Sequence, residues 1–280
     1  MRRTVPLILA TLCLIALAAC SRPALELPPD RLATQAAATR TFVAAMVPSA
    51  TPPPSATPIQ TATPEPTPTD TPAPEPTETI PTYGEDDARF GLAYDSPSVI
   101  DDFSVRYKWG EPWFQGAVIY WQDESLYAVD YVTDNYVMWS TSLLEARDFY
   151  VEITASIGEC VGDDSYGVAG RIGGDLVNSG YTLEFSCDGA YRFRKFVNGS
   201  VISLIDWIPN PAINAGGDQT NTIGLLARGD QLYAYANGVF LGTISDRTFH
   251  TGLFGLFANA LQTESLTVIF DDFRLWYITP

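Results

Sequence analysis

Positive charge is scarce in this sequence. Its 280 residues include 16 Lys and Arg against 33 Asp and Glu, for a formal net charge of −17. From Glu85 onward we count 27 acidic and 11 basic residues, a net of −16, so nearly all of the acidity lies in the C-terminal part. Nucleic-acid-binding proteins present basic patches to the phosphates, and this composition argues against that class. The same negative charge disfavours peripheral binding to anionic lipid membranes. It is compatible with binding of neutral sugars or cations, or with a role in solubility alone.

The first 20 residues have the composition of an export signal. Met1-Arg2-Arg3 is positively charged, and residues 5–19 are apolar except for Thr11. A run of about 15 residues fits a secretory signal and falls short of the roughly 20 residues of a spanning helix. It leads to Leu17-Ala18-Ala19-Cys20, which resembles a bacterial lipobox. The resemblance implies cleavage before Cys20, a diacylglyceryl group on its thiol, and an extracytoplasmic protein anchored by lipid to a bacterial membrane at the cell surface. The alternative is an ordinary signal cleaved after an A-x-A-like site, with Cys20 incidental.

Proline and threonine dominate the segment that follows. Residues 48–81 alternate the two types, and residues 21–47 have only marginal helical character. Proline lacks an N–H donor and fixes φ, so the segment favours polyproline II and builds no core. At about 3.1 Å per residue, some 30 residues would reach on the order of 90 Å. We therefore expect a lipoprotein signal and lipobox (1–20), a disordered Pro/Thr-rich stalk (21–82) and a folded domain (83–280). A featureless spacer is the alternative to the stalk.

Four cysteines are present in the sequence. Cys13 would leave with the signal and Cys20 would carry lipid, which leaves Cys160 and Cys187 in an exported domain, where disulfides persist. We expect these two to be bridged, and the alternative is two buried free thiols. Two cysteines alone do not make a zinc site.

Beyond about residue 82, apolar and polar residues alternate at the period of a β-strand. Residues 151–157 and 181–187 show this clearly. Pairs such as Asn198-Gly199 and Asn237-Gly238 suit the positive φ angles of tight hairpins, and no long helix is predicted. The sequence therefore predicts an all-β domain, an antiparallel β-sandwich. Further strands are expected over residues 166–172, 191–197, 201–206, 221–228, 231–236, 239–244, 252–258 and 266–277.

The strand prediction also places the cysteines. If residues 151–157, 166–172 and 181–187 form a meander, the first and third strands run parallel to each other. Cys160 and Cys187 then lie at the same end of one sheet, and the bridge crosses the middle strand. Closing a loop of about 27 residues is worth roughly 3 kcal/mol.

Several short motifs follow one another in a set order along the predicted strands. They are Asp101-Asp102-Phe103, Trp139, Asp148-Phe149-Tyr150-Val151-Glu152, Asp163-Asp164-Ser165-Tyr166-Gly167-Val168, Arg171, Asp188-Gly189-Ala190-Tyr191-Arg192-Phe193, Tyr235-Ala236-Asn237-Gly238, Gly252-Leu253-Phe254-Gly255-Leu256 and Phe270-Asp271-Asp272-Phe273-Arg274-Leu275. Their order resembles the concanavalin A-like lectin/glucanase superfamily, close to its laminin-G-like and 3-keto-disaccharide-hydrolase-like branches. The resemblance covers about residues 101–277 and implies a jelly roll of two curved antiparallel sheets. It also implies that the first and last strands pair, with Phe103 and Phe273 in neighbouring strands.

The catalytic motif of that superfamily's retaining glucanases, Glu-x-Asp-x-x-Glu on one strand, is missing from the sequence. Glu145 and Asp148 have the wrong spacing, and Glu184 has no acidic residue two positions on. His250 is the single histidine and has no nucleophile motif beside it, so nothing supports a Ser-His-Asp arrangement. We name no catalytic residue, and we expect a protein that is not an enzyme.

Aromatic and polar side chains on the predicted strands supply candidates for binding a sugar. Sugars stack on Trp and Tyr, while charged and amide groups bond their hydroxyls. Tyr233 and Tyr235 share one face by their spacing, opposite Leu232 and Ala234. For each candidate, packing within the sandwich is the alternative, and Trp109, Trp113, Trp121 and Trp139 are expected to serve packing. The ligand-binding candidates are Trp207, Tyr166, Arg171, Glu184, Arg192, Tyr233 and Tyr235.

Calcium is the one cofactor that the resemblance suggests, as a structural ion where the terminal strands meet. Asp101, Asp102, Asp271 and Asp272 are the candidate ligands, with solvated turn residues as the alternative. The preferred hypothesis is a surface-tethered lipoprotein that presents a non-catalytic jelly roll for binding a glycan or another surface ligand. The alternatives are a hydrolase of the 3-keto-disaccharide type and a structural or adhesive module that binds protein.

Overall fold

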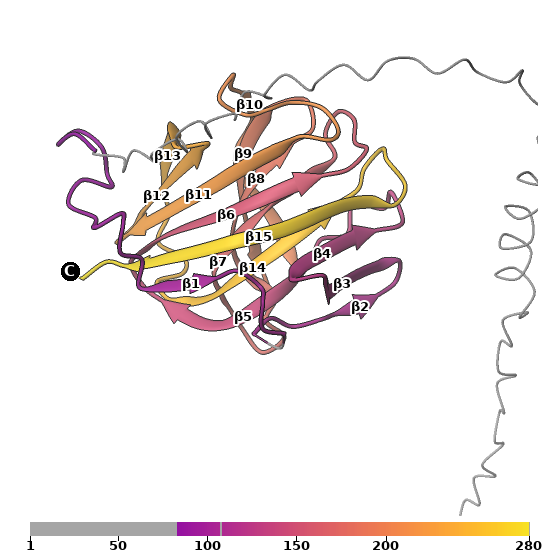
Figure 1. Cartoon of the computed structure of the whole chain (residues 1–280), viewed down its shortest axis with the longest axis horizontal. Coiled ribbons are helices and arrows are strands. Elements are labelled where there is room, and N and C mark those ends of the chain that lie inside the picture. The colour runs from indigo at the N-terminus through magenta and orange to yellow at the C-terminus, as the bar shows by residue number, and fades with distance from the viewer. Residues whose placement is uncertain (1–82, 107, 280) are drawn as a thin grey trace, which may run out of the picture. The chain divides into compact units, whose positions relative to one another are not determined.

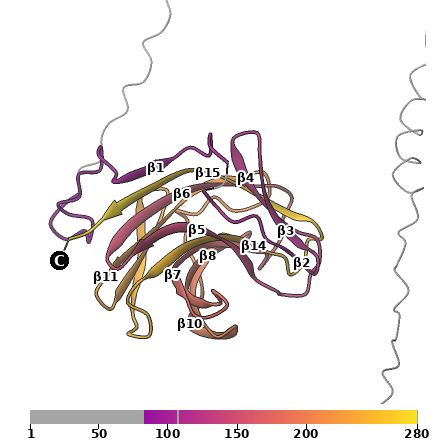
Figure 2. The ribbon, with the colours of Figure 1, turned by 90° about the horizontal axis from the view of Figure 1, so that it is seen from below.

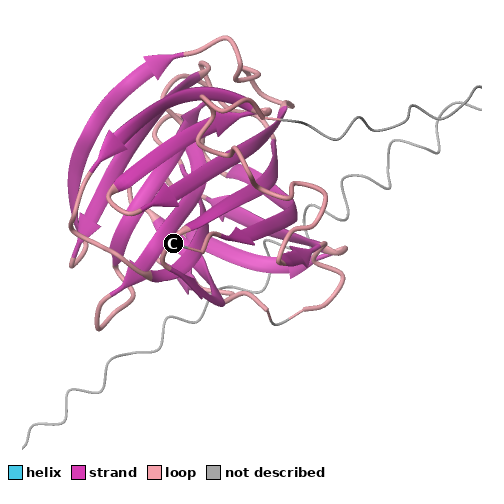
Figure 3. Cartoon of the chain, turned by 90° about the vertical axis from the view of Figure 1, so that its left-hand side faces the viewer, coloured by secondary structure: helices cyan, strands magenta, loops and turns pink. Residues whose placement is uncertain are grey.

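The structure is a computed structural model that describes residues 83–106 and 108–279, and these residues form strands and loops without a helix (Figure 1 and Figure 3). In this part of the chain, no helix is long and apolar enough to span a membrane. The predictions for the signal, for Cys20 and for the Pro/Thr-rich stalk concern residues 1–82 and lie outside the described residues.

Two antiparallel sheets pack face to face as two layers (Figure 2). The predicted antiparallel β-sandwich is therefore confirmed. The nine-stranded sheet has the order β13 (Val239–Ser245), β12 (Gln231–Ala236), β11 (Thr220–Arg228), β6 (Phe149–Ile157), β15 (Leu266–Tyr277), β4 (Ser125–Asp130), β3 (Ala117–Gln122), β2 (Trp113–Phe114), with β1 (Val99–Asp101) paired to β15. The six-stranded sheet has the order β10 (Ser200–Pro209), β9 (Ala190–Val197), β8 (Ser179–Ser186), β7 (Ser165–Gly173), β14 (Gly252–Asn259), β5 (Met138–Ala146).

Period-two alternation decides which side chains enter the space between the sheets. In β6, Val151, Ile153 and Ala155 are buried in the main core, whereas Tyr150 belongs to a second cluster on the other face of the sheet. A buried aliphatic side chain of this size contributes about 1.5–3 kcal/mol through the hydrophobic effect. The alternation seen in the sequence is thus the pattern that fixes each strand's inner face.

The terminal strands pair and the tight turns form as predicted, although Phe103 lies just beyond β1 and not in a strand. β1 pairs with β15 and places Asp101 opposite Phe273, while Phe103 follows two residues after β1 and packs in the same core. Asn198-Gly199 and Asn237-Gly238 both have positive φ at their two positions, which are 51° and 79° in the first turn and 50° and 81° in the second. Asn and Gly tolerate this left-handed geometry, and it matches the twist of the hairpin strands.

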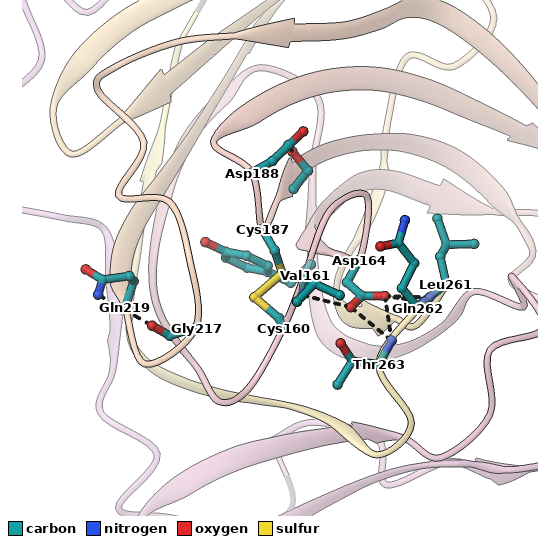
Figure 4. The surroundings of a disulfide bond; sticks show 12 residues. Cys160, Val161, Asp164, Cys187, Asp188, Gly217, Gln219, Leu261, Gln262 and Thr263 are labelled. Atoms are coloured by element: carbon teal, nitrogen blue, oxygen red, sulfur yellow. Dashed lines mark hydrogen bonds between the residues drawn. A yellow bond between two sulfur atoms is a disulfide. The ribbon is translucent and has the colours of Figure 1, made fainter.

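The predicted disulfide between Cys160 and Cys187 is confirmed, with 5.9 Å between the two Cα atoms (Figure 4). The predicted meander is wrong, because β6 pairs with β11 and β15 in the nine-stranded sheet, whereas β7 and β8 pair in the six-stranded sheet. Periodicity indicates which face of a strand is buried but not the sheet to which the strand belongs. The bridge therefore ties one sheet to the other.

Asp164 anchors the loop that contains Cys160 (Figure 4). Its buried carboxylate accepts hydrogen bonds from the backbone N–H groups of Leu261, Gln262 and Thr263 at 2.7, 2.7 and 3.2 Å. Burial opposes ionisation, but these bonds outweigh it and lower the pKa of Asp164. Asp164 immediately precedes β7, and residues 260–265 connect its neighbour β14 to β15, so this carboxylate fixes the connection that leaves the six-stranded sheet at the end of the β7–β14 pair.

The segment before β1 covers part of the outer face of the nine-stranded sheet. Tyr94 stacks on Trp276 with 5.2 Å between the ring centroids, and its hydroxyl donates to Glu152 at 2.6 Å. The Arg89 guanidinium lies 3.9 Å from the centroid of the Tyr235 ring. The outward aromatics of this sheet therefore form a second, smaller core with the chain that precedes the sandwich.

Candidate functional site

A row of side chains crosses the outer face of the six-stranded sheet, the face turned away from the core. The strand register sets Trp139 of β5 opposite Phe257 of β14, and Phe257 opposite Gly167 of β7. Gly167 in turn faces Glu184 of β8, and Glu184 faces Arg192 of β9. Residues far apart in the sequence are thus brought into one line by strand pairing.

Glu184 lies between Gly167 and Arg192 in this row and is fully buried. Its Oε2 accepts hydrogen bonds from Arg192 Nη2 at 2.8 Å and from Arg194 Nη2 at 2.7 Å. Its Oε1 accepts from Arg194 Nε and from the Thr182 hydroxyl. The Trp207 ring covers the Arg192 guanidinium, with 4.1 Å between Cζ and the ring centroid. We call Glu184, Arg192 and Arg194 the arginine–glutamate cluster.

A hollow of about 380 Å³ lies on the same side of the six-stranded sheet. Its lining includes the aromatic rings of Tyr136, Trp139 and Phe196 and the amides of Asn135 and Asn178. Trp139 meets Phe196 edge-to-face with 5.0 Å between centroids, and its Nε1 donates to the Val177 carbonyl at 2.9 Å. We call this the Trp139 hollow, and its aromatic walls with two amides suit the apolar faces and hydroxyls of a sugar.

Curling of the sheet brings the two walls of the Trp139 hollow together. β5 and β9 are four steps apart in the sheet order, which at about 4.8 Å per step puts them roughly 19 Å apart in a flat sheet. The Trp139 and Phe196 rings nevertheless touch. Gly167 lies at the middle of the row, where the neighbouring residues leave no room for a side chain. A Cβ there would lie 2.1 Å from the Leu183 carbonyl oxygen and 3.0 Å from the Phe257 ring. No larger residue fits that position without a shift of the backbone.

Three of the seven predicted ligand-binding residues come together at the arginine–glutamate cluster, namely Trp207, Glu184 and Arg192. Sequence analysis did not single out their partner Arg194. The alternation of β9 could have indicated Arg194, because it lies two residues after Arg192 and side chains two apart on a strand share a face.

Tyr166 and Arg171 lie inside the sandwich and do not reach this face. Tyr166 is 1% exposed, its hydroxyl accepts a bond from Asn221 Nδ2 at 2.8 Å, and burial raises the pKa of its phenol to about 12. Arg171 is equally buried and donates to the carbonyls of Arg147 and Phe249. For these two candidates the structure supports the packing alternative, because neither presents a polar group to a ligand.

Tyr233 and Tyr235 lie on the outer face of the opposite, nine-stranded sheet, as their spacing predicts. Tyr235 is buried beneath Arg89, and its hydroxyl donates to Asp87 at 3.2 Å. A second hollow, of about 490 Å³, is lined by both tyrosines together with Phe240 and acidic residues of the preceding segment. These two candidates therefore belong to a different place from Trp207, Glu184 and Arg192.

Trp139 was expected to serve packing, and its ring both packs against Phe196 and lines the hollow. Trp113 departs from that expectation, because its side chain is 79% exposed on the edge strand β2. Trp109 packs in the core as expected. A single sequence shows that a tryptophan lies in a strand, but the curl of the sheet decides which ring lines a hollow.

The four aspartates predicted to bind calcium gather where β1 meets β15. Asp101 is buried and accepts hydrogen bonds from Lys108 Nζ at 2.8 Å and from Trp109 Nε1 at 3.2 Å, so protein donors already serve its oxygens. The pKa of Asp271 is raised, first by burial and then by the nearby negative charges of Asp272, Asp102 and Asp101. Across residues 83–106 and 108–279, no group of three or more His, Cys, Asp or Glu side chains is arranged to hold a metal ion. Calcium binding stays a prediction.

Asp271→Asn should increase the free energy of unfolding at pH 7 by up to about 1 kcal/mol, because it removes one of several like charges at a half-exposed position. The folded-state pKa of Asp271 is raised, so the wild type loses stability as pH rises through that pKa, and the advantage of the variant vanishes below the unfolded pKa of about 3.9. Thermal melts at pH 7 and pH 3.5 measure this. Bound calcium would offset the same repulsion, so added calcium should raise the wild-type Tm more than that of the variant. A variant that is less stable than the wild type at pH 7 contradicts this account.

No protein-family model matches this chain, and no curated protein matches it in sequence. Several solved structures are similar to part of it. The carbohydrate-binding module CBM66 from Bacillus subtilis is 18% identical with a TM-score of 0.48, over 60% of this chain and 95% of that one. A protein of unknown function with a galectin-like fold, also from Bacillus subtilis, is 13% identical with a TM-score of 0.49, over 65% and 96%. The Bacillus licheniformis β-glucanase is 12% identical with a TM-score of 0.47, over 65% and 99%. These likenesses assign the chain to no family.

Proposed function

We propose that the sandwich is a non-catalytic module that binds a glycan in the Trp139 hollow. The observation that carries this proposal is the hollow itself, in which the rings of Tyr136, Trp139 and Phe196 stand beside two amide side chains. Tyr136 is 44% exposed and also meets the exposed ring of Phe114, with 5.5 Å between centroids, so the aromatic surface extends beyond the hollow. Such a surface offers stacking positions to more than one sugar ring.

The burial of Glu184 supports binding without bond cleavage. Glycosidases of the common type need two carboxyl groups about 5–9 Å apart that flank the scissile bond. Glu184 is fully buried, and its oxygens accept hydrogen bonds from two guanidinium groups, so the carboxyl group has no access to a scissile bond.

Trp139→Ala should lower the affinity for a bound glycan by about thirtyfold or more, because a buried aromatic contact at a binding site is typically worth about 2 kcal/mol or more. The measurement is a screen of oligosaccharides and polysaccharides against the full-length protein in a detergent without sugar head groups, with reducing-sugar release read from the same wells. Trp139→Phe keeps a ring and should retain part of the affinity. It separates loss of stacking from loss of fold.

Tyr233→Ala is the matched control, since it removes an aromatic ring from the second hollow on the opposite sheet. It should leave the affinity unchanged. Glycan binding that depends on Tyr233 and not on Trp139 would move the site to the nine-stranded sheet and overturn the proposal. Release of reducing sugar would show an enzyme.

The lipid anchor belongs to the same proposal, with a Pro/Thr stalk that holds the sandwich away from the membrane at the cell surface. Its support is the signal segment and the Leu17-Ala18-Ala19-Cys20 box. A labelled lipid precursor should be incorporated into the wild-type protein, and Cys20→Ser should abolish the label and release the protein from the membrane fraction. Absence of the label from the wild type would contradict the anchor.

A further inference from the structure

The arginine–glutamate cluster contains one positive charge more than it balances. Glu184 supplies a single carboxylate for two guanidinium groups, and the side chains of Arg192 and Arg194 are only 15% and 7% exposed. Charges removed from water are ordinarily paired, because an unpaired one loses its solvation without compensation. The excess positive charge of the cluster, at a fixed position on the outer face of the six-stranded sheet, can therefore bind an anionic group of a ligand.

Arg192 is the member of the cluster that reaches the surface. It uses Nε and Nη2 on Glu184, at 3.0 and 2.8 Å, and within the described residues its Nη1 has no acceptor. The Trp207 ring lies against the guanidinium plane at 4.1 Å, which fixes the direction of the remaining N–H groups. A guanidinium held in this way loses little conformational entropy when it binds a carboxylate.

A series of contacts connects Arg192 to the Trp139 hollow. The Phe196 ring lines the hollow and lies 5.4 Å from the Arg194 guanidinium, and Arg194 shares the Glu184 carboxylate with Arg192. The arginines do not line the hollow but follow Phe196 along the same face of β9, so an oligosaccharide that extends from the hollow along this strand passes Arg194 and then Arg192. From this arrangement we infer that the glycan carries an acidic sugar, whose carboxylate is bound by Arg192. This inference rests on the proposed glycan-binding function.

The charge of the whole domain narrows the ligand class further. The sequence from Glu85 onward carries a net charge of −16, so a long polyanion would meet repulsion as it approached. At physiological salt, such repulsion is screened beyond roughly 8 Å, and a single carboxylate needs to contact only the local cation. The fitting ligand is an oligosaccharide of neutral sugars with one uronic acid, at its end or on a branch.

The test compares acidic oligosaccharides with their carboxyl-reduced counterparts, in which the same sugar carries CH2OH in place of the carboxylate. The wild-type protein should prefer the acidic member of a pair by about tenfold or more, as expected for a charge-assisted hydrogen bond. Arg192→Gln should lose most of this preference, measured as the ratio of the affinities for the two members, while Arg194 still pairs with Glu184. Arg247→Gln, which removes a surface arginine paired with Asp230, is the matched control and should keep the preference.

Two outcomes overturn the inference, namely equal binding of both members by the wild type and an unchanged preference in Arg192→Gln. A separate readout covers the case in which no glycan binds and the proposed function fails. Sodium glucuronate should then shift the arginine Nε–H signals in the NMR spectrum of the wild type but not of Arg192→Gln, whereas glucose should shift neither. If glucuronate shifts no arginine signal, the carboxylate site is rejected, whether or not a glycan binds.

Discussion

Glu184→Ala is expected to lower the free energy of unfolding by about 3–5 kcal/mol, the usual cost of removing one partner of a buried ion pair. The carboxylate is fully buried and accepts bonds from Arg192, Arg194 and Thr182. Alanine would leave two guanidinium groups without a counter-charge in a place with little water. The loss should appear as a lower midpoint in urea unfolding with an unchanged slope.

Two further variants identify the cause of that loss. Glu184→Gln keeps the volume and one acceptor oxygen while removing the charge, so its stability should fall between those of the wild type and Glu184→Ala. Adding Arg194→Met to Glu184→Ala should cost less than the sum of the two single changes, because the second change removes a charge that the first had left unpaired.

Asp230→Asn is the control for the loss of an ion pair at the surface, where Arg247 is 83% exposed, and it should cost under about 1 kcal/mol. If Glu184→Ala were no more destabilising than this control, the cluster would not be a buried ion network. The charge argument for an acidic ligand would then lose its basis as well.

The sequence predicted the strands better than their arrangement. The expected range 266–277 coincides with β15, and the Asn-Gly turns have the predicted φ angles. These features depend on local chemistry, namely side-chain alternation and the tolerance of Asn and Gly for left-handed backbone. Local features of this kind can be predicted from a single sequence.

The candidate site depends on pairing between strands that are distant in the sequence. Trp139 and Phe196 are 57 positions apart and touch because the six-stranded sheet curls. Glu184 and Arg192 were named as ligand-binding candidates, and in the structure the carboxylate is the buried partner of two arginines. Strand register and sheet curvature decide such roles, and the periodicity of a single sequence predicts neither of them.

Removing the disulfide with Cys160→Ser and Cys187→Ser should lower the free energy of unfolding by about 3–4 kcal/mol and the Tm by about 10 °C. The bridge closes a loop with a sequence separation of 27, and breaking it enlarges the unfolded ensemble. Both cysteines are under 8% exposed, so a reductant added to the native protein should act slowly and the serine variant is the cleaner measurement. Wild-type protein unfolded and refolded with reductant should match the variant.

The position of this bridge between the two sheets sets what the variant keeps. Asp164 holds the loop of Cys160 to the backbone of Leu261, Gln262 and Thr263 through hydrogen bonds that do not involve the bridge. The double serine variant should therefore remain folded at 25 °C with its glycan affinity intact, since Trp139 and Arg192 lie in other strands. Adding Asp164→Ala should cost more than it does in the wild type, because the two links restrain the same loop. Strictly additive losses would show that the bridge and the carboxylate act independently.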